Sequence, residues 1–364
     1  MKKIYLVIFS ILFLFNETFA QHNNTWISFW NKDSTLIGFK DQTGKIKITP
    51  KFNSFTTASQ FDNIIGVAQE KGGKIISCYL TKRGRIVGKD SLYIFDNGAD
   101  CESEGYIRFR GKLTHKVGMF NGDGNIAIPA DYNYLAPVRN SMIMATKDGH
   151  WDASQQSEHN QFPWVGGKDI LIDTHNKVLV ENFPFDENIN FFSLIVSEQP
   201  NNNRIRQNFK ATNGKYYSFI NFDKEFKAWL KDSLLNKLTA ANLLRVSYKK
   251  ITFWNKPKGW INEAKEPFID KNYKLIKSKL LELNSANCDY SIFTEGLNPY
   301  IYNSKDFDKY FNNCGASKDW IYPIKNVVIN HKINMDILQD QFQFLRTDTG
   351  YKLIEMSINV GEIQ

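Results

Sequence analysis

Between residues 21 and 183, hydrophobic residues fall in short runs, and polar turns that contain glycine interrupt these runs about every ten residues. Gly44, Gly84 and Gly124 lie in three of the turns. Phrases such as Ile-Lys-Ile at residues 46–48 alternate apolar with polar positions, so each strand would present one apolar face. Because a single hairpin cannot bury such a face alone, the pattern predicts an all-β array of stacked hairpins.

The hairpins repeat with a period of about forty residues. Residues 38–52 (GFKDQTGKIKITPKF) and residues 118–132 (GMFNGDGNIAIPADY) share a glycine with an aromatic residue close behind it, a turn glycine, an Ile-x-Ile phrase, a proline and a closing aromatic residue. The unit around Gly84 keeps only the turn. A fourth unit, residues 170–182, has Asn176 in the turn position, where asparagine tolerates the left-handed backbone that glycine supplies.

These phrases resemble the WG-repeat family of bacterial proteins. The resemblance rests on the phrases Gly38-Phe39 and Gly118-Met119-Phe120, the prolines Pro50 and Pro129, and the closing pairs Phe52-Asn53 and Tyr132-Asn133. Ile37 and Val117 stand where the family has its tryptophan, which makes the chain a divergent match. The resemblance covers residues 26–183 and implies a β-rich module that mediates interactions and has no established catalytic residues.

The pattern changes after residue 183. Residues 184–214 predict a connecting segment, and residues 215–364 predict an α+β domain with a curved antiparallel sheet. The predicted elements are helices over residues 222–238, 265–283 and 305–311 and strands within residues 290–301 and 324–358. The closing phrase FQFLRTDTGYKLIEMSI resembles the last hairpin of the nuclear transport factor two-like superfamily, which implies a cone-shaped domain with a pocket.

The start of the chain is typical of a secretory signal peptide over residues 1–20. Lys2 and Lys3 precede an apolar run over residues 4–15, and Ala20 ends the segment. We therefore expect an exported protein, in the periplasm, on the outer surface or secreted, with no membrane span after signal cleavage. The formal net charge is +8, but acids separate the basic residues, which argues against a nucleic-acid groove.

Export makes disulfides the expected state of the four cysteines. The cysteines form two pairs that are local in sequence, Cys78 with Cys101 and Cys288 with Cys314, and each pair would close a loop of about 25 residues. The alternative is that the thiols are free and buried.

A polar insertion between residues 150 and 167 interrupts the array. It contains Trp151, Phe162 and Trp164, which would form exposed platforms for a partner or a sugar, or would fold back as a cap on the array. We interpret these three residues as the candidate contact surface.

The sequence contains no recognisable catalytic, metal or cofactor motif. His150, His159 and His175 lack the spacing of metal ligands, and Cys288 with His331 is better explained as a structural thiol than as a nucleophile with its base. The leading hypothesis is a non-catalytic exported WG-repeat protein that acts as a protein-interaction module in the cell envelope, with an unknown protein partner. The alternatives are small-ligand binding or hydrolysis in the C-terminal cone, and binding of a glycan through exposed tryptophans.

Overall fold

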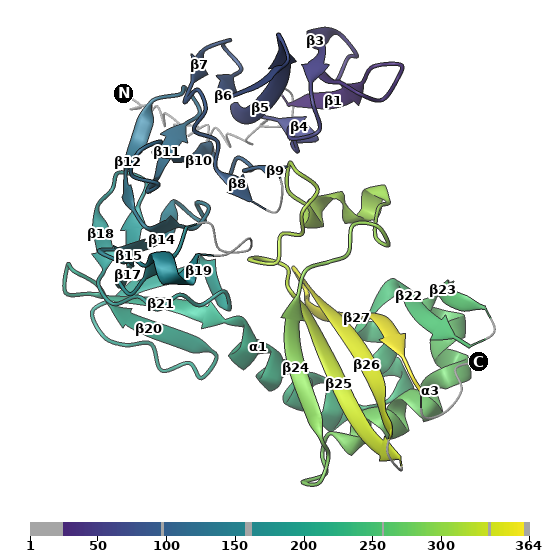
Figure 1. Ribbon diagram of the computed structural model, residues 1–364. Helices are drawn as coiled ribbons and strands as arrows, with labels where there is room; N and C mark the ends of the chain where they lie inside the picture. Colours follow the sequence, from purple (N-terminus) through teal and green to yellow (C-terminus); the bar gives the residue numbers. More distant parts are fainter. Residues whose placement is uncertain (1–24, 96–97, 157–161, 257, 334–335, 360–364) are drawn as a thin grey trace, which may run out of the picture.

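The computed structural model describes residues 25–95, 98–156, 162–256, 258–333 and 336–359, so the predicted signal peptide lies outside the described residues. The described chain is mostly β, with several small antiparallel sheets followed by a mixed six-stranded sheet with helices. The small sheets follow one another along an arc, and the large sheet lies beyond its end (Figure 1). This order confirms the predicted β-repeat module followed by a domain of helices and strands.

Four units of the described array share one architecture, a three-stranded antiparallel sheet with the second strand in the middle. The units are β1 (Trp26–Trp30), β2 (Ile37–Lys40) and β3 (Ile46–Phe52); β5 (Ile64–Lys71), β6 (Lys74–Thr81) and β7 (Ile86–Val87); β10 (Tyr106–Arg110), β11 (Val117–Asn121) and β12 (Ile126–Tyr132); and β14 (Met142–Lys147), β17 (Lys168–Asp173) and β18 (Val178–Val180). Shorter strands accompany them: β4 (Gln60–Phe61), β8 (Ile94–Phe95), β9 (Gly98–Ala99), β13 (Tyr134–Leu135), β15 (His150–Trp151) and β16 (Trp164–Val165). The second unit, of which the sequence shows only the turn, therefore has the complete sheet.

The turn after the second strand is built in the same way in each unit. The carbonyl of the first turn residue accepts the N–H of the fourth, and its N–H donates to the carbonyl of the fifth. In the first unit these bonds join Asp41 to Gly44 (2.9 Å) and to Lys45 (3.0 Å). The Asp41 carboxylate also accepts the backbone N–H of Lys45 at 3.0 Å. The fourth residue needs a left-handed backbone, and φ is 87° at Gly44 and 65° at Asn176. The asparagine therefore fills the turn position, as the repeat pattern predicts.

The glycine of the Gly-aromatic phrase is required by the close approach of the neighbouring strand. A Cβ on Gly118 would lie 2.7 Å from the backbone oxygen of Ile128, and a Cβ on Gly38 would lie 2.6 Å from that of Ile48. Both glycines lie at a shift in the strand register, where a β-bulge brings the two backbones together.

Residues 184–214, which the sequence predicts as a connecting segment, contain ordered strands. β19 (Ile189–Ser197), β20 (Arg206–Lys210) and β21 (Tyr216–Asn221) form a sheet with β21 in the middle. Phe183, Phe191 and Phe219 in this region share a buried cluster with Leu171 of the fourth unit. The β-structure of the array therefore continues to residue 221, although the strand order of this last sheet differs.

The C-terminal sheet has the order β23-β22-β27-β26-β25-β24. Its elements are α1 (Phe222–Trp229), α2 (Ala240–Arg245), β22 (Ser247–Asn255), β23 (Gly259–Ala264), α3 (Lys265–Glu282), β24 (Tyr290–Glu295), β25 (Ile324–Ile333), β26 (Asp336–Thr347) and β27 (Gly350–Ser357), with a 3-10 helix at Lys305–Tyr310. β22 and β27 run parallel, so the sheet is mixed and not antiparallel throughout as the predicted antiparallel sheet would be. The helix predicted over residues 222–238 is regular only to Trp229 and continues as a π turn and a 3-10 turn.

A long connection between β24 and β25, residues 296–323, extends from the C-terminal sheet back to the first sheets of the array (Figure 1). The Asn313 carbonyl accepts the backbone N–H groups of Ser59 (2.8 Å) and Gln60 (2.9 Å), and the Asn313 side chain donates to Asp62 at 2.5 Å. The connection therefore links the C-terminal sheet to the first unit of the array.

Among the described helices, none combines the length and apolarity that a bilayer span requires.

We expect Gly118→Ala to lower the free energy of unfolding by about 1–3 kcal/mol, because the added Cβ would collide with the backbone of β12. Gly44→Asn is the control and should cost less than about 1 kcal/mol, because the site is open and asparagine tolerates a positive φ. Urea unfolding of the mature chain measures both changes, and equal losses would contradict this explanation of the glycine.

Candidate binding site between the repeat array and the C-terminal domain

A cavity of about 770 Å³ lies between the array and the connection that returns from the C-terminal sheet. Its walls come mainly from residues 99–108 and 134–140 of the array and residues 312–321 of the connection. The volume falls in the range of about 300–1,000 Å³ that is usual for small-molecule sites. The two parts of the chain that sequence analysis treats separately thus form one site together.

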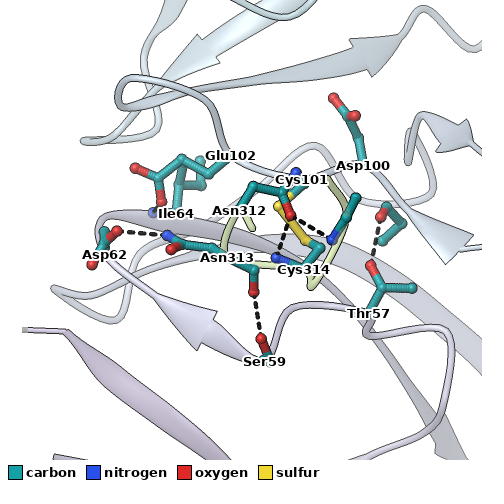
Figure 2. The surroundings of a disulfide bond; sticks show 12 residues. Thr57, Ser59, Asp62, Ile64, Asp100, Cys101, Glu102, Asn312, Asn313 and Cys314 are labelled. Atoms are coloured by element: carbon teal, nitrogen blue, oxygen red, sulfur yellow. Dashed lines mark hydrogen bonds between the residues drawn. A yellow bond between two sulfur atoms is a disulfide. The ribbon is translucent and has the colours of Figure 1, made fainter. Parts of the chain in front are cut away.

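A disulfide between Cys101 and Cys314 joins the two walls of the cavity (Figure 2). The predicted pairs, Cys78 with Cys101 and Cys288 with Cys314, are therefore wrong. Cys78 and Cys288 are free, half-buried thiols, and burial raises the pKa of both. The prediction assumed that neighbours in sequence pair, but the connection folds back and brings Cys314 to the array, so the disulfide joins residues that are 213 positions apart.

Cys314 lies in a turn that has the same hydrogen bonds as the turns of the repeat units. Asn312 N–H donates to the Ala316 carbonyl at 2.9 Å, and Gly315 N–H donates to the Asn312 carbonyl at 3.0 Å. The Asn312 side chain accepts the N–H groups of Cys314 and Ala316 (2.9 and 3.0 Å), and φ at Gly315 is 76°. The phrase NNCGA at residues 312–316 shares its glycine with DQTGK at residues 41–45, and each phrase begins with a residue, Asn312 or Asp41, whose side-chain oxygen accepts backbone N–H groups. These two features are the sequence signal for this turn.

A buried ion pair fixes the array wall next to the disulfide. The Arg108 guanidinium donates to both carboxylate oxygens of Asp100, at 2.6 and 2.9 Å, and to the Leu135 carbonyl at 3.0 Å. The side chains of the pair are 4% and 5% exposed, and the guanidinium also lies 4.2 Å from the Tyr93 ring centre. Because so many donors of Arg108 are bound within the protein, this arginine is a structural part of the wall.

A second arginine on the array wall, Arg139, has different surroundings. Its guanidinium carbon lies 4.7 Å from the centre of the Trp320 ring, which belongs to the connection. Its Nε is buried and has no hydrogen-bond partner within the described part of the chain, where no carboxylate forms an ion pair with Arg139 either. Burial lowers the pKa of Arg139, while Asp319 and Glu187 oppose that shift. An arginine nevertheless stays protonated, so the cavity contains a cation with donors to offer.

Trp151, Phe162 and Trp164 lie together in the structure. The rings of Trp151 and Trp164 are perpendicular with centres 5.3 Å apart, and His115 of the third unit lies 5.4 Å from Phe162. The Arg110 guanidinium lies 3.7 Å from the Phe162 ring centre. Trp151 is 38% exposed, and the other two aromatic side chains are half-buried. These three aromatic residues therefore pack against the third unit, and Trp151 remains partly on the surface.

The other residues tested for chemistry do not gather. Among the described residues, no three His, Cys, Asp or Glu side chains form a group that could hold a metal ion, and His159 lies outside the described residues. His331 contacts the carboxylates of Asp340 at 2.8 Å and Glu282 at 3.8 Å. Burial raises the pKa of the Cys288 thiol, which makes this thiol less reactive as a nucleophile.

The comparison with protein families places a WG containing repeat at residues 118–151, from Gly118 in β11 to Trp151 in β15. The chain is therefore similar to WG-repeat proteins over the second and third strands of its third unit and the start of its fourth. No curated protein and no solved structure matches the chain. Nothing supports the predicted resemblance of the C-terminal part to the nuclear transport factor two-like superfamily.

We expect peptide mapping without reduction to recover a cross-link between Cys101 and Cys314. The double variant Cys101→Ser/Cys314→Ser should lower the free energy of unfolding by about 3–5 kcal/mol, because the bond closes a very long loop in the unfolded chain. The control, Cys78→Ala/Cys288→Ala, removes the two free thiols and should cost about 1 kcal/mol. Recovery of the two local pairs would contradict the observed connectivity.

Asp100→Asn should lower the free energy of unfolding by about 3–5 kcal/mol, because it leaves the buried Arg108 charge without its counter-ion. Asp123→Asn removes a carboxylate from an exposed pair with Arg83 and should change stability by less than about 0.5 kcal/mol. Both effects are measured by denaturant unfolding, and a cost near zero for Asp100→Asn would show that the pair does not hold the wall.

Proposed function

We propose that this protein is an exported, non-catalytic binding protein of the cell envelope, and that its ligand occupies the cavity between the repeat array and the C-terminal domain. The observation that carries the proposal is a cavity of about 770 Å³ whose two walls are joined by the Cys101–Cys314 disulfide. A site with walls held in place in this way loses little freedom when a ligand binds, which favours affinity.

The hydrogen bonds of three carboxylates in the cavity support binding rather than catalysis by these groups. The Glu104 carboxylate accepts the backbone N–H groups of Asn140 and Ser141 (2.5 and 2.8 Å), and the Glu102 carboxylate accepts those of Asn63 and Ile64 (2.9 and 3.1 Å). The Asp100 carboxylate is bound to Arg108, as described above. These three carboxylates hold loops and the array wall in place, so they are not available as a general acid and base.

The binding proposal can be tested with a variant that fills the cavity. Ala316 lines the cavity and is exposed, so Ala316→Trp places an indole in the ligand's space, while Ala286→Trp adds the same side chain at an exposed position outside the cavity. Oxidised protein spanning residues 21–364 is incubated with the low-molecular-mass fraction of a cell-envelope extract and examined by native mass spectrometry. We expect a discrete bound mass on the wild type and Ala286→Trp that is absent from Ala316→Trp. An unliganded wild type, or equal binding by all three proteins, contradicts the proposal.

The second candidate function is protein interaction through the repeat array, with Trp151, Phe162 and Trp164 as the contact surface. The exposure of Trp151 favours it, because tryptophan is enriched at the centres of protein interfaces. We expect alanine at all three positions to abolish capture of the envelope protein that wild-type bait retains. The matched control is Trp254→Ala/Trp260→Ala, which removes an exposed tryptophan pair from the C-terminal domain. Unchanged capture by the triple variant would exclude this surface.

A further inference from the structure

Arg139 makes no side-chain hydrogen bond or ion pair within the described part of the chain, and this indicates the class of ligand that the cavity binds. We infer that the cavity binds a small zwitterion, an amino acid or a short peptide with free ends, and that Arg139 binds its carboxylate. This inference rests on the proposed binding function of the same cavity and adds the chemistry of the ligand.

The first step of the argument is the availability of the Arg139 donors. A guanidinium that stacks on an aromatic ring keeps the N–H groups in its plane free for hydrogen bonds, and its fork matches the two oxygens of a carboxylate. Arg139 lies over Trp320 at 4.7 Å and makes no side-chain hydrogen bond or ion pair within the described part of the chain. Arg108, in the same cavity, donates to Asp100 and to a backbone carbonyl. Of these two arginines, Arg139 is the one with donors left for a ligand.

The second step is the sign of the charge around Arg139. Asp319 and Glu187 line the cavity and act electrostatically on the guanidinium, although neither carboxylate forms an ion pair with it in the described structure. These two carboxylates would repel a phosphate or another multiply charged anion, and they would attract an ammonium group. A ligand that carries a carboxylate and an ammonium group places one charge near Arg139 and the other near Asp319 or Glu187, so both signs are neutralised.

The third step is the room for an apolar side chain. Tyr134, Pro137 and Phe192 also line the cavity, and Phe192 is 46% exposed. Aromatic and apolar surface next to a few charged groups is the usual composition of a small-ligand site. It favours a peptide that carries a hydrophobic residue, since burial of that residue would add to the affinity.

The inference is tested by calorimetric titration of oxidised protein, residues 21–364, with the dipeptides Ala-Leu and Ala-Phe. We expect binding of at least one of them, weakened about 10- to 100-fold by amidation of the C-terminus of the peptide or by Arg139→Gln, because each change removes a charge-assisted hydrogen bond. Arg139→Lys should recover only part of the affinity, since lysine keeps the charge and lacks the fork. N-acetylation of the peptide should weaken binding to the wild type more than binding to Asp319→Asn.

D-glucuronate and inorganic phosphate serve as anions without an ammonium group, and Arg85→Gln serves as a control arginine outside the cavity. Tighter binding of either anion than of the dipeptides would overturn the zwitterion, and so would a wild type that binds neither dipeptide. Dipeptide binding that is lost in Ala316→Trp but intact in Arg139→Gln would leave the cavity as the binding site and overturn the role of Arg139. Dipeptide binding that Ala316→Trp does not change would overturn the proposed site itself.

A readout without ligand separates a binding role of Arg139 from a structural one. The unfolding temperature of Arg139→Gln should stay within about 3 °C of the wild type, because no hydrogen bond to the described protein is lost. The matched variant Arg108→Gln should unfold at a clearly lower temperature, since it breaks the buried pair with Asp100. A loss for Arg139→Gln as large as that for Arg108→Gln would show that Arg139 is structural and overturn the inference.

Discussion

The position of one turn, residues 312–316, determines the form of the cavity. The Asn313 carbonyl binds two consecutive backbone N–H groups next to β4, and the neighbouring Cys314 is bonded to Cys101 (Figure 2). These contacts fix the connection against the array, and the connection carries Trp320, whose ring lies under Arg139. The array and the C-terminal domain also meet near α1 and β25, where the Lys325 ammonium donates to Asp223 and Asn188.

The turn that fixes the connection is also the turn of the repeat. Its hydrogen bonds join the first residue to the fourth and fifth, and a side-chain acceptor at the first position and a left-handed fourth residue stabilise it. Each of these features depends on five consecutive residues and not on the surrounding sheet, so the same turn forms in the array at residues 41–45 and in the C-terminal domain at residues 312–316. The C-terminal domain thus presents to the array a piece of the array's own local structure.

The sequence predicts what depends on neighbouring residues and fails where distant segments meet. The turns at Gly44 and Asn176 and the helix α3 follow from local patterns, and the structure contains them. The parallel pairing of β22 with β27 joins strands about a hundred residues apart, and no local period signals it. The same holds for the disulfide, where the assumption of local pairs assigned Cys314 to Cys288. The cavity could not be predicted for the same reason, since Arg139 and Trp320 meet only in the folded chain.

The two arginines of the cavity show how a protein divides structural from binding roles between identical side chains. Arg108 is buried and Asp100 balances its charge, so removal of either residue lowers the stability of the fold. Arg139 is held by its backbone pairing with Met142 and by the face of Trp320, which position the guanidinium without using its donors. Leaving a charge unpaired inside a protein costs stability, and a fold retains such a charge most readily where a ligand supplies the missing partner. One arrangement therefore combines the unpaired Arg139 cation, the Asp319 and Glu187 carboxylates and the disulfide that joins the two walls of the cavity.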